Sequence, residues 1–132
     1  MRRAALVVLL LAACASPSGA EVATCDGSWR GVESRIVRPG GENAMTLAIE
    51  CMRPVDDKRV RIGFLMPAGP TCYRLSEIEV VEAAEAVSFT LVASVDDNPA
   101  AGACPEDETR TATEIDLQAP VGERALLDGS RP

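Results

Sequence analysis

Several stretches of the chain alternate between hydrophobic and polar residues with a period of two, which is typical of β-strands with one buried face. In residues 59–66, for example, hydrophobic side chains fall on one face, and Arg59 and Arg61 fall on the other. The rows predicted to face a core are Val60, Ile62, Phe64 and Met66; Met45, Leu47, Ile49 and Cys51; Val87, Phe89, Leu91, Ala93 and Val95; and Thr111, Thr113, Ile115 and Leu117.

Turn-forming residues separate these rows, at positions 39–41, 54–57, 67–70 and 96–99. Short strands divided by frequent turns predict an all-β fold, a small antiparallel β-sandwich of the Ig-like or Greek-key type. The shorter runs 32–37 and 125–127 add edge strands, which gives about seven strands in all.

Residues 73–86 fit two structures. Ser76-Glu77-Ile78-Glu79 has the form of a helix capping box, and helix-forming residues follow it. However, Ile78 and Val80 continue a period-two face, and a helix would have to end before the strongly alternating residues 87–95. We therefore predict a strand over residues 73–82, with residues 82–85 forming a hairpin connection.

The N-terminus has the layout of a secretory signal. Arg2 and Arg3 precede an uncharged apolar run over residues 4–13, which is too short for a membrane-spanning helix of roughly 20 residues. Leu11-Ala12-Ala13-Cys14 resembles the lipobox of bacterial lipoproteins, in which the cysteine is acylated, palmitate being the typical chain, and becomes the new N-terminus. The alternative is cleavage after Ser18-Gly19-Ala20, which would release the protein.

The lipobox predicts a definite domain organisation. A lipoprotein signal peptide covers residues 1–13, a lipidated Cys14 and flexible tether cover residues 14–24, and a single domain covers residues 25–132. The expected location is the extracytoplasmic face of the cell membrane, with the lipid anchor as the membrane contact.

Charge and composition narrow the possible functions. Without Arg2 and Arg3 the chain keeps 11 basic and 20 acidic side chains, a balance of −9 that argues against nucleic-acid binding. The chain has no histidine, so the usual general base and the commonest zinc ligand are missing. We expect no enzymatic activity, no cofactor and a monomer.

Four cysteines remain besides Cys14. In an exported protein, the oxidising environment should convert them to two disulfides. Three pairings are possible; we favour Cys25–Cys51 with Cys72–Cys104, each closing a loop of roughly 30 residues and contributing about 3–4 kcal/mol. A four-cysteine metal site is disfavoured because the chain has no Cys-x-x-Cys pair.

The C-terminal half resembles a recurring module of uncharacterised secreted lipoproteins from high-GC Gram-positive bacteria. The similarity covers residues 72–129 and includes Cys72, Cys104 and the strands between them. Its most telling part is a strand at residues 115–118, a Pro-x-Gly-x-Arg turn ending at Arg124, a short strand and Asp128-Gly129. The resemblance implies a small β-domain and an envelope location, and it supplies no catalytic residues.

The long segment 96–110 is the first candidate for partner binding, because loops on rigid scaffolds often carry recognition. Two acidic clusters flank Cys104 in this segment and offer oxygen ligands for Ca²⁺, although their spacing matches no known calcium loop. We favour a solvent-exposed, disulfide-held loop. The possible partner-binding residues are Asp96, Asp97, Asn98, Pro99, Ala100, Ala101 and Gly102.

Two further features are candidate sites. Glu77, Glu79 and Glu82 form an acidic row in which two carboxylates on one strand face lie about 7 Å apart, a separation that suits glycosidases. We expect an outward acidic stripe instead. Trp29 is either a core plug against the Cys25–Cys51 bridge, which we favour, or an exposed binding aromatic.

Together these patterns predict a lipid-anchored cell-envelope protein with a non-enzymatic binding or structural role and an envelope protein as its partner. The first alternative is a secreted protease inhibitor or receptor-binding module that uses residues 96–110. The second is a small envelope enzyme.

Overall fold

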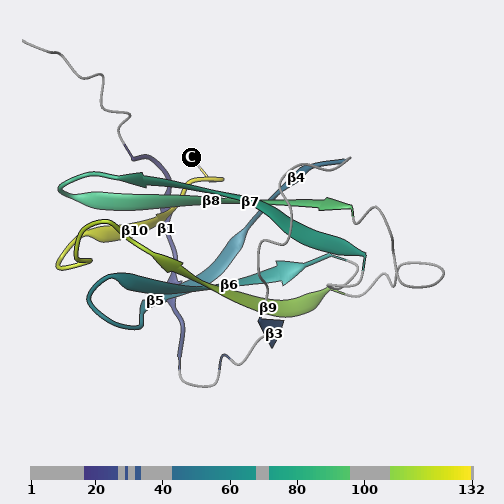
Figure 1. Cartoon of the computed structure of the whole chain (residues 1–132), viewed down its shortest axis with the longest axis horizontal. Coiled ribbons are helices and arrows are strands. Elements are labelled where there is room, and N and C mark those ends of the chain that lie inside the picture. Colours follow the sequence, from purple (N-terminus) through teal and green to yellow (C-terminus); the bar gives the residue numbers. More distant parts are fainter. Residues whose placement is uncertain are drawn as a thin grey trace, which may run out of the picture.

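The computed structural model describes residues 17–26, 29, 32–33, 43–67, 72–95 and 108–131. These residues form ten strands and no helix. The strands make two five-stranded sheets that pack face to face (Figure 1). The prediction of an all-β sandwich is therefore confirmed.

The first sheet is built around its longest hairpin. Strand β7 pairs antiparallel with one edge of β8 along its whole length, and β10 and β4 pair with successive parts of the opposite edge of β8. The members of this sheet are β1 (Ala20–Glu21), β10 (Ala125–Asp128), β8 (Ala86–Val95), β4 (Met45–Leu47) and β7 (Tyr73–Glu82).

The second sheet has an antiparallel centre, in which β6 lies between β5 and β9. A two-residue strand pairs with each outer member of this centre. In spatial order the strands are β2 (Ala23–Thr24), β5 (Ile49–Pro54), β6 (Arg59–Met66), β9 (Thr109–Asp116) and β3 (Val32–Glu33).

Three strand pairs depart from the predicted antiparallel arrangement. Strand β10 runs parallel to β8, β2 runs parallel to β5, and β3 runs parallel to β9. The period-two pattern shows which face of a strand is buried, but it carries no information on the direction of the neighbouring strand.

At two points a single residue carries the chain from one sheet to the other. The chain changes sheets at Val22, between β1 and β2, and again at Ala48, between β4 and β5. Such transfers form the corners of β-sandwiches. The single strand predicted over residues 43–51 is thus divided at Ala48. The flexible tether predicted over residues 14–24 is wrong for β1 and β2, which are paired within the two sheets.

A buried carboxylate holds the transfer at Ala48. Asp128 is fully buried, and its Oδ2 accepts a hydrogen bond from the backbone N–H of Ile49 at 3.0 Å. Its Oδ1 accepts hydrogen bonds from the backbone N–H and the hydroxyl of Ser130 at 2.9 and 2.6 Å. Arg131 lies 3.3 Å from Oδ2, so the charge of this carboxylate is paired.

The core between the sheets is formed mainly by the rows that the sequence predicted, but the prediction is wrong at Met45, which is 38% exposed, and Val95 is only partly buried. Val60, Ile62, Phe64 and Met66 of β6 have no exposed surface, and neither do Val87, Phe89, Leu91 and Ala93 of β8. Thr111 and Thr113 of β9 lie opposite Phe64 and Ile62 and are also buried.

The predicted row ending in Cys51 is wrong at that residue. A register shift between Ile49 and Cys51 inserts one residue into β5, so Ile49 joins the core, while Cys51 lies opposite Gly63 on the outer face. A β-bulge of this kind reverses the alternation that the sequence pattern assumes.

Strand β7 confirms the strand prediction for residues 73–82 and excludes the helix. A second bulge, between Leu75 and Glu77, leaves Ser76 without a cross-strand partner residue on β8. Its buried hydroxyl lies 2.8 Å from the hydroxyl of Ser94 and donates to the carbonyl of Val92.

Candidate functional site

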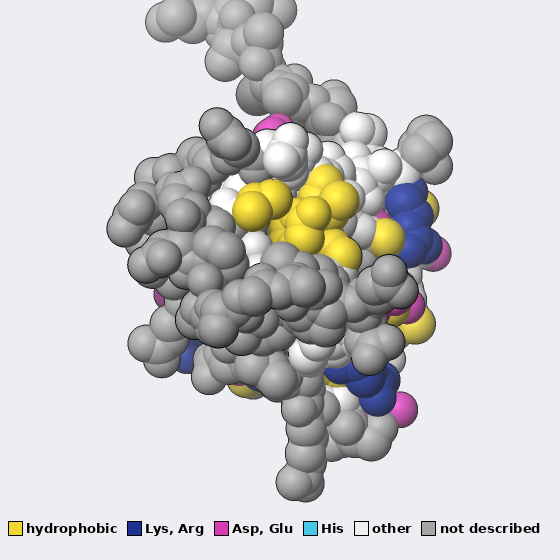
Figure 2. Space-filling model, turned by 90° about the vertical axis from the view of Figure 1, so that its right-hand side faces the viewer, with side chains coloured by type: hydrophobic (Ala, Val, Ile, Leu, Met, Phe, Trp, Pro, Cys, Tyr) yellow, Lys and Arg dark blue, Asp and Glu magenta, His cyan; other side chains and the backbone are white. Residues whose placement is uncertain are grey.

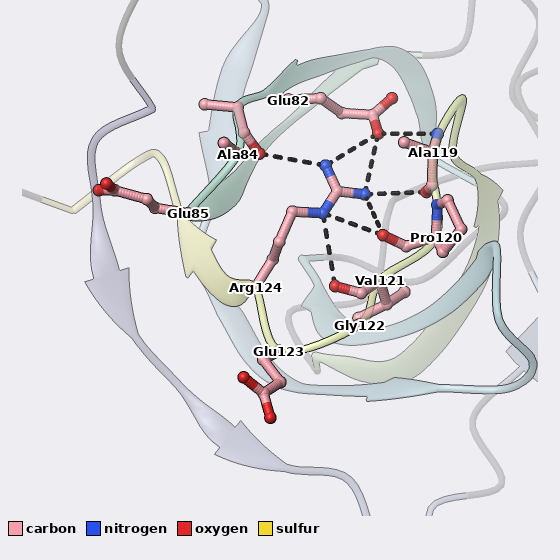
Figure 3. Close-up of a pocket in the computed structure, with 10 residues that line it drawn as sticks. Glu82, Ala84, Glu85, Ala119, Pro120, Val121, Gly122, Glu123 and Arg124 are labelled. Atoms are coloured by element: carbon pink, nitrogen blue, oxygen red, sulfur yellow. Dashed lines mark hydrogen bonds and ion pairs between the residues drawn. The ribbon is translucent and has the colours of Figure 1, made fainter.

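Glu82 and Arg124 form a clasp between the last residue of β7 and the turn before β10. Both Nη atoms of Arg124 bind Oε1 of Glu82, at 3.2 and 3.1 Å (Figure 3). The side chains are only 10% and 20% exposed, so solvent screens this ion pair weakly. The clasp links the end of the first sheet to the chain that leaves the second sheet after β9.

Arg124 also closes its own turn. Its Nη2 donates to the carbonyls of Ala119 and Pro120, both at 2.8 Å, and its Nη1 donates to the carbonyl of Ala83 at 3.3 Å. Its Nε donates to the carbonyls of Pro120 and Val121. All three guanidinium nitrogens are therefore engaged within the protein.

The Glu82 carboxylate is held in its ionised form. Burial by itself would raise the pKa of Glu82, but three partners more than offset this effect. Backbone N–H groups of Gln118 and Ala119 donate to its two oxygens at 2.9 and 3.3 Å, and Arg124 adds its positive charge. The net result is a pKa below the ordinary value for glutamate.

An open depression of about 640 Å³ surrounds the clasp, and residues 82–85 and 119–124 line it. Figure 3 shows the side chains of Glu85 and Glu123 directed away from the guanidinium. The depression thus contains an arginine whose nitrogens are already engaged and a carboxylate that is ionised and paired. Such groups stabilise a turn, but they offer neither an anion site nor a general acid.

No local pattern in the sequence indicates that Glu82 and Arg124 form a pair. In the sequence, Arg124 ends the Pro-x-Gly-x-Arg turn, while Glu82 belongs to the acidic row and to the predicted hairpin connection. Gly122 at the centre of the turn has φ of +53°, a left-handed conformation that favours glycine. Together with Pro120, it is the local signal of a tight turn here.

Trp29 lies on the outer face of the second sheet and is half-buried. A Cβ on Gly63 would overlap the indole ring and would lie 2.7 Å from Sγ of Cys51, so the ring and the sulfur are neighbours. The guanidinium of Arg110 lies 3.9 Å from the ring centroid, which is cation–π geometry. Trp29 is therefore beside the disulfide, as expected, but it lies outside the main core.

The predicted Cys25–Cys51 disulfide is confirmed, with a Cα–Cα separation of 4.8 Å. Cys72 is buried and is also disulfide-bonded. Cys104 lies outside the described residues, so the Cys72–Cys104 pairing stays a prediction.

The acidic row does not form one site. Glu77 and Glu79 are exposed on the outer face of β7, opposite Val92 and Thr90. Glu82 belongs to the other face of this strand and binds Arg124. The arrangement agrees with an outward acidic pair rather than with catalytic carboxylates.

The remaining predicted site residues lie outside the described part of the chain. These are the lipobox cysteine and the partner-binding segment 96–102. Of the two acidic clusters proposed to bind Ca²⁺, only Glu108 is described, and it is exposed. Within the described ranges, no group of three or more potential ligands gathers at a metal site. The same ranges contain no helix that is long and apolar enough to cross a membrane.

Comparisons with known protein families, with curated protein sequences and with solved structures find no match. The fold and the contacts described above are therefore the basis of the functional argument.

Proposed function

We propose that this protein is a lipoprotein of the bacterial cell envelope, anchored by lipid on Cys14, and that it acts by binding a partner rather than by catalysis. The observation that carries the anchoring is the position at which the chain enters the fold. Ala20 pairs with Asp128 in β1, only six residues after the lipobox cysteine.

The entry point separates the two possible cleavage sites. Gly19 packs so closely on the backbone of Asp128 that a Cβ there would overlap the Asp128 carbonyl. Cleavage after Ala20 would remove Gly19 and half of the two-residue strand β1. Cleavage before Cys14 leaves both in place, which supports the lipoprotein interpretation.

The short connection also supports an orientation on the membrane. Six residues span at most about 20 Å, so the domain would stay close to the bilayer surface. Pro17 lies beside the β7–β8 hairpin, at residues 83–86. Strand β8 then carries the chain about 30 Å from this hairpin to Val95. The hairpin would therefore face the membrane, and the opposite end of the sandwich would face away from it.

That opposite end has the character of a binding surface. The strands β6 and β8 finish there, and Figure 2 shows hydrophobic side chains gathered in the middle of this face. Contiguous exposed hydrophobic patches are typical of interaction sites for proteins, membranes or ligands. The ionised, paired Glu82 in the open depression supports the same conclusion, because a general acid needs a raised pKa.

The test is fatty-acid labelling of cells that produce the wild type, Cys14→Ser or, as a matched control, Ser16→Ala. We expect label and membrane association for the wild type and the control, and neither for Cys14→Ser. The N-terminus of the mature wild-type protein decides the result independently. An unlabelled protein that begins at Glu21 would overturn the proposal in favour of a secreted form.

A further inference from the structure

Among the residues that the structure describes, strand β7 is paired along one of its two edges. It pairs with β8 along its length, and among the described residues it has no strand on its other side. The backbone N–H and C=O groups that point away from β8 are therefore open to an additional strand. Such edges are the sites at which extended peptides join a sheet.

The usable part of this edge runs from Glu77 to Val81. At the N-terminal end of this segment, the bulge at Ser76 interrupts regular pairing. At its C-terminal end, Glu82 is bound to Arg124 in the clasp. Five strand residues remain, a length of about 17 Å. An added strand of similar length would find a regular template here.

The side chains of this edge alternate in a defined way. Glu77 and Glu79 are exposed on the outer face of the sheet. Ile78 and Val80 point to the inner face, where they are half-buried against the core. An added strand would place alternate side chains beside the two carboxylates and the others over these two apolar side chains.

Charge decides which strand fits. A second copy of β7 would bring acidic residues against acidic residues, and like charges on paired strands repel. A basic residue beside each carboxylate would be attracted instead. The edge therefore selects a strand in which basic and apolar residues alternate.

We propose that the β7 edge from Glu77 to Val81 binds an extended segment of a partner protein by strand addition, with Lys or Arg beside Glu77 and Glu79 and apolar residues over Ile78 and Val80. This inference rests on the proposed binding role and names the class of partner segment. It requires neither the lipid anchor nor the segment 96–110.

The experiment measures binding of a labelled, end-capped Lys-Val-Lys-Val-Lys-Val peptide to the detergent-solubilised full-length mature protein by fluorescence anisotropy. We expect the double variant Glu77→Lys/Glu79→Lys to weaken binding at least tenfold and to gain binding of the matching Glu-Val peptide. The control Glu85→Lys/Glu123→Lys changes the net charge equally at exposed positions away from this edge and should bind as the wild type does. Thermal melting checks that all three proteins are folded.

Four results would overturn the proposal. Equal losses in both double variants would indicate general charge attraction. Undiminished binding of a Lys-Val peptide N-methylated at alternate residues would exclude backbone pairing. No binding to the wild type would leave the carboxylates as a guard against edge-to-edge aggregation. Sedimentation of the wild type as a dimer that Glu77→Lys/Glu79→Lys dissociates would replace the peptide by a second copy. None of these results affects fatty-acid labelling of Cys14, so the two proposals fail separately.

Discussion

Replacing Arg124 by alanine tests whether the clasp holds the sandwich together at its hairpin end. The change removes the ion pair with Glu82, and a hydrogen-bonded charge of this kind contributes about 1.5–3 kcal/mol. The carbonyls of Ala119 and Pro120 also lose their donor, but they lie near the surface and regain water, which limits their share to about 1 kcal/mol. We expect a loss of about 3 kcal/mol in unfolding free energy, or a melting temperature about 12 °C lower.

Arg59→Ala is the matched control for this measurement. Arg59 pairs with Asp116 at 2.8 Å, a shorter distance than any in the clasp, but these side chains are 46% and 76% exposed. Exposed pairs such as this one contribute little to stability, because water and salt screen them. Urea unfolding of both variants, followed by the fluorescence of Trp29 and by far-UV circular dichroism, gives the comparison. If Arg124→Ala destabilised the protein no more than Arg59→Ala, the argument from burial would be refuted.

Three further changes test other contacts. Because the fold lowers the pKa of Glu82, its carboxylate stabilises the protein above the unfolded-state value of about 4.3, and this contribution is lost as the pH falls through the lower folded value. Between pH 7 and pH 3, the unfolding free energy measured with urea should therefore fall less for Glu82→Gln than for the wild type. An equal fall in both proteins would contradict this prediction. Gly63→Val should displace the Trp29 ring and lower the unfolding free energy by about 2 kcal/mol. The tryptophan emission should rise as the ring moves away from the disulfide. Unchanged emission would exclude the contact between Trp29 and the disulfide. Asp128→Ala should lower the unfolding free energy by about 3 kcal/mol, because the N–H of Ile49 stays buried without its acceptor. Asp128→Asn keeps an acceptor oxygen, so equilibrium unfolding should show less than half of this loss. Similar losses in both variants would show that the charge, not the hydrogen bond, matters.

The predictable part of the fold was the part encoded locally. Alternation identified the buried faces of β6 and β8 because each strand must turn one face to the core, whatever its neighbours are. The same alternation decided correctly for a strand over β7 against a plausible capping box. Of the three possible pairings, the favoured one, which joins cysteines that are neighbours in the sequence, is confirmed for Cys25–Cys51.

The features that could not be predicted from the sequence depend mainly on contacts between distant residues. The transfer at Ala48 is held by a bond between Ile49 and Asp128, which are 79 positions apart. The clasp joins residues 42 positions apart, and its arginine resembles a surface residue in the sequence. The bulge that turns Cys51 outward has no local signal, because Ile49 and Cys51 both suit a buried strand position.

The Cys25–Cys51 disulfide has a mechanical consequence. A pull on the N-terminus first meets β1 and β2, which have only two residue pairs each with their neighbours and can peel away at low force. The load then reaches Cys25, where a covalent bond passes it to Cys51 within β5. Peeling residues 20–24 lengthens the chain by about 17 Å and leaves the other strands in place. Under shear, a sandwich held in this way would therefore lengthen its N-terminal connection before the rest of the fold came apart.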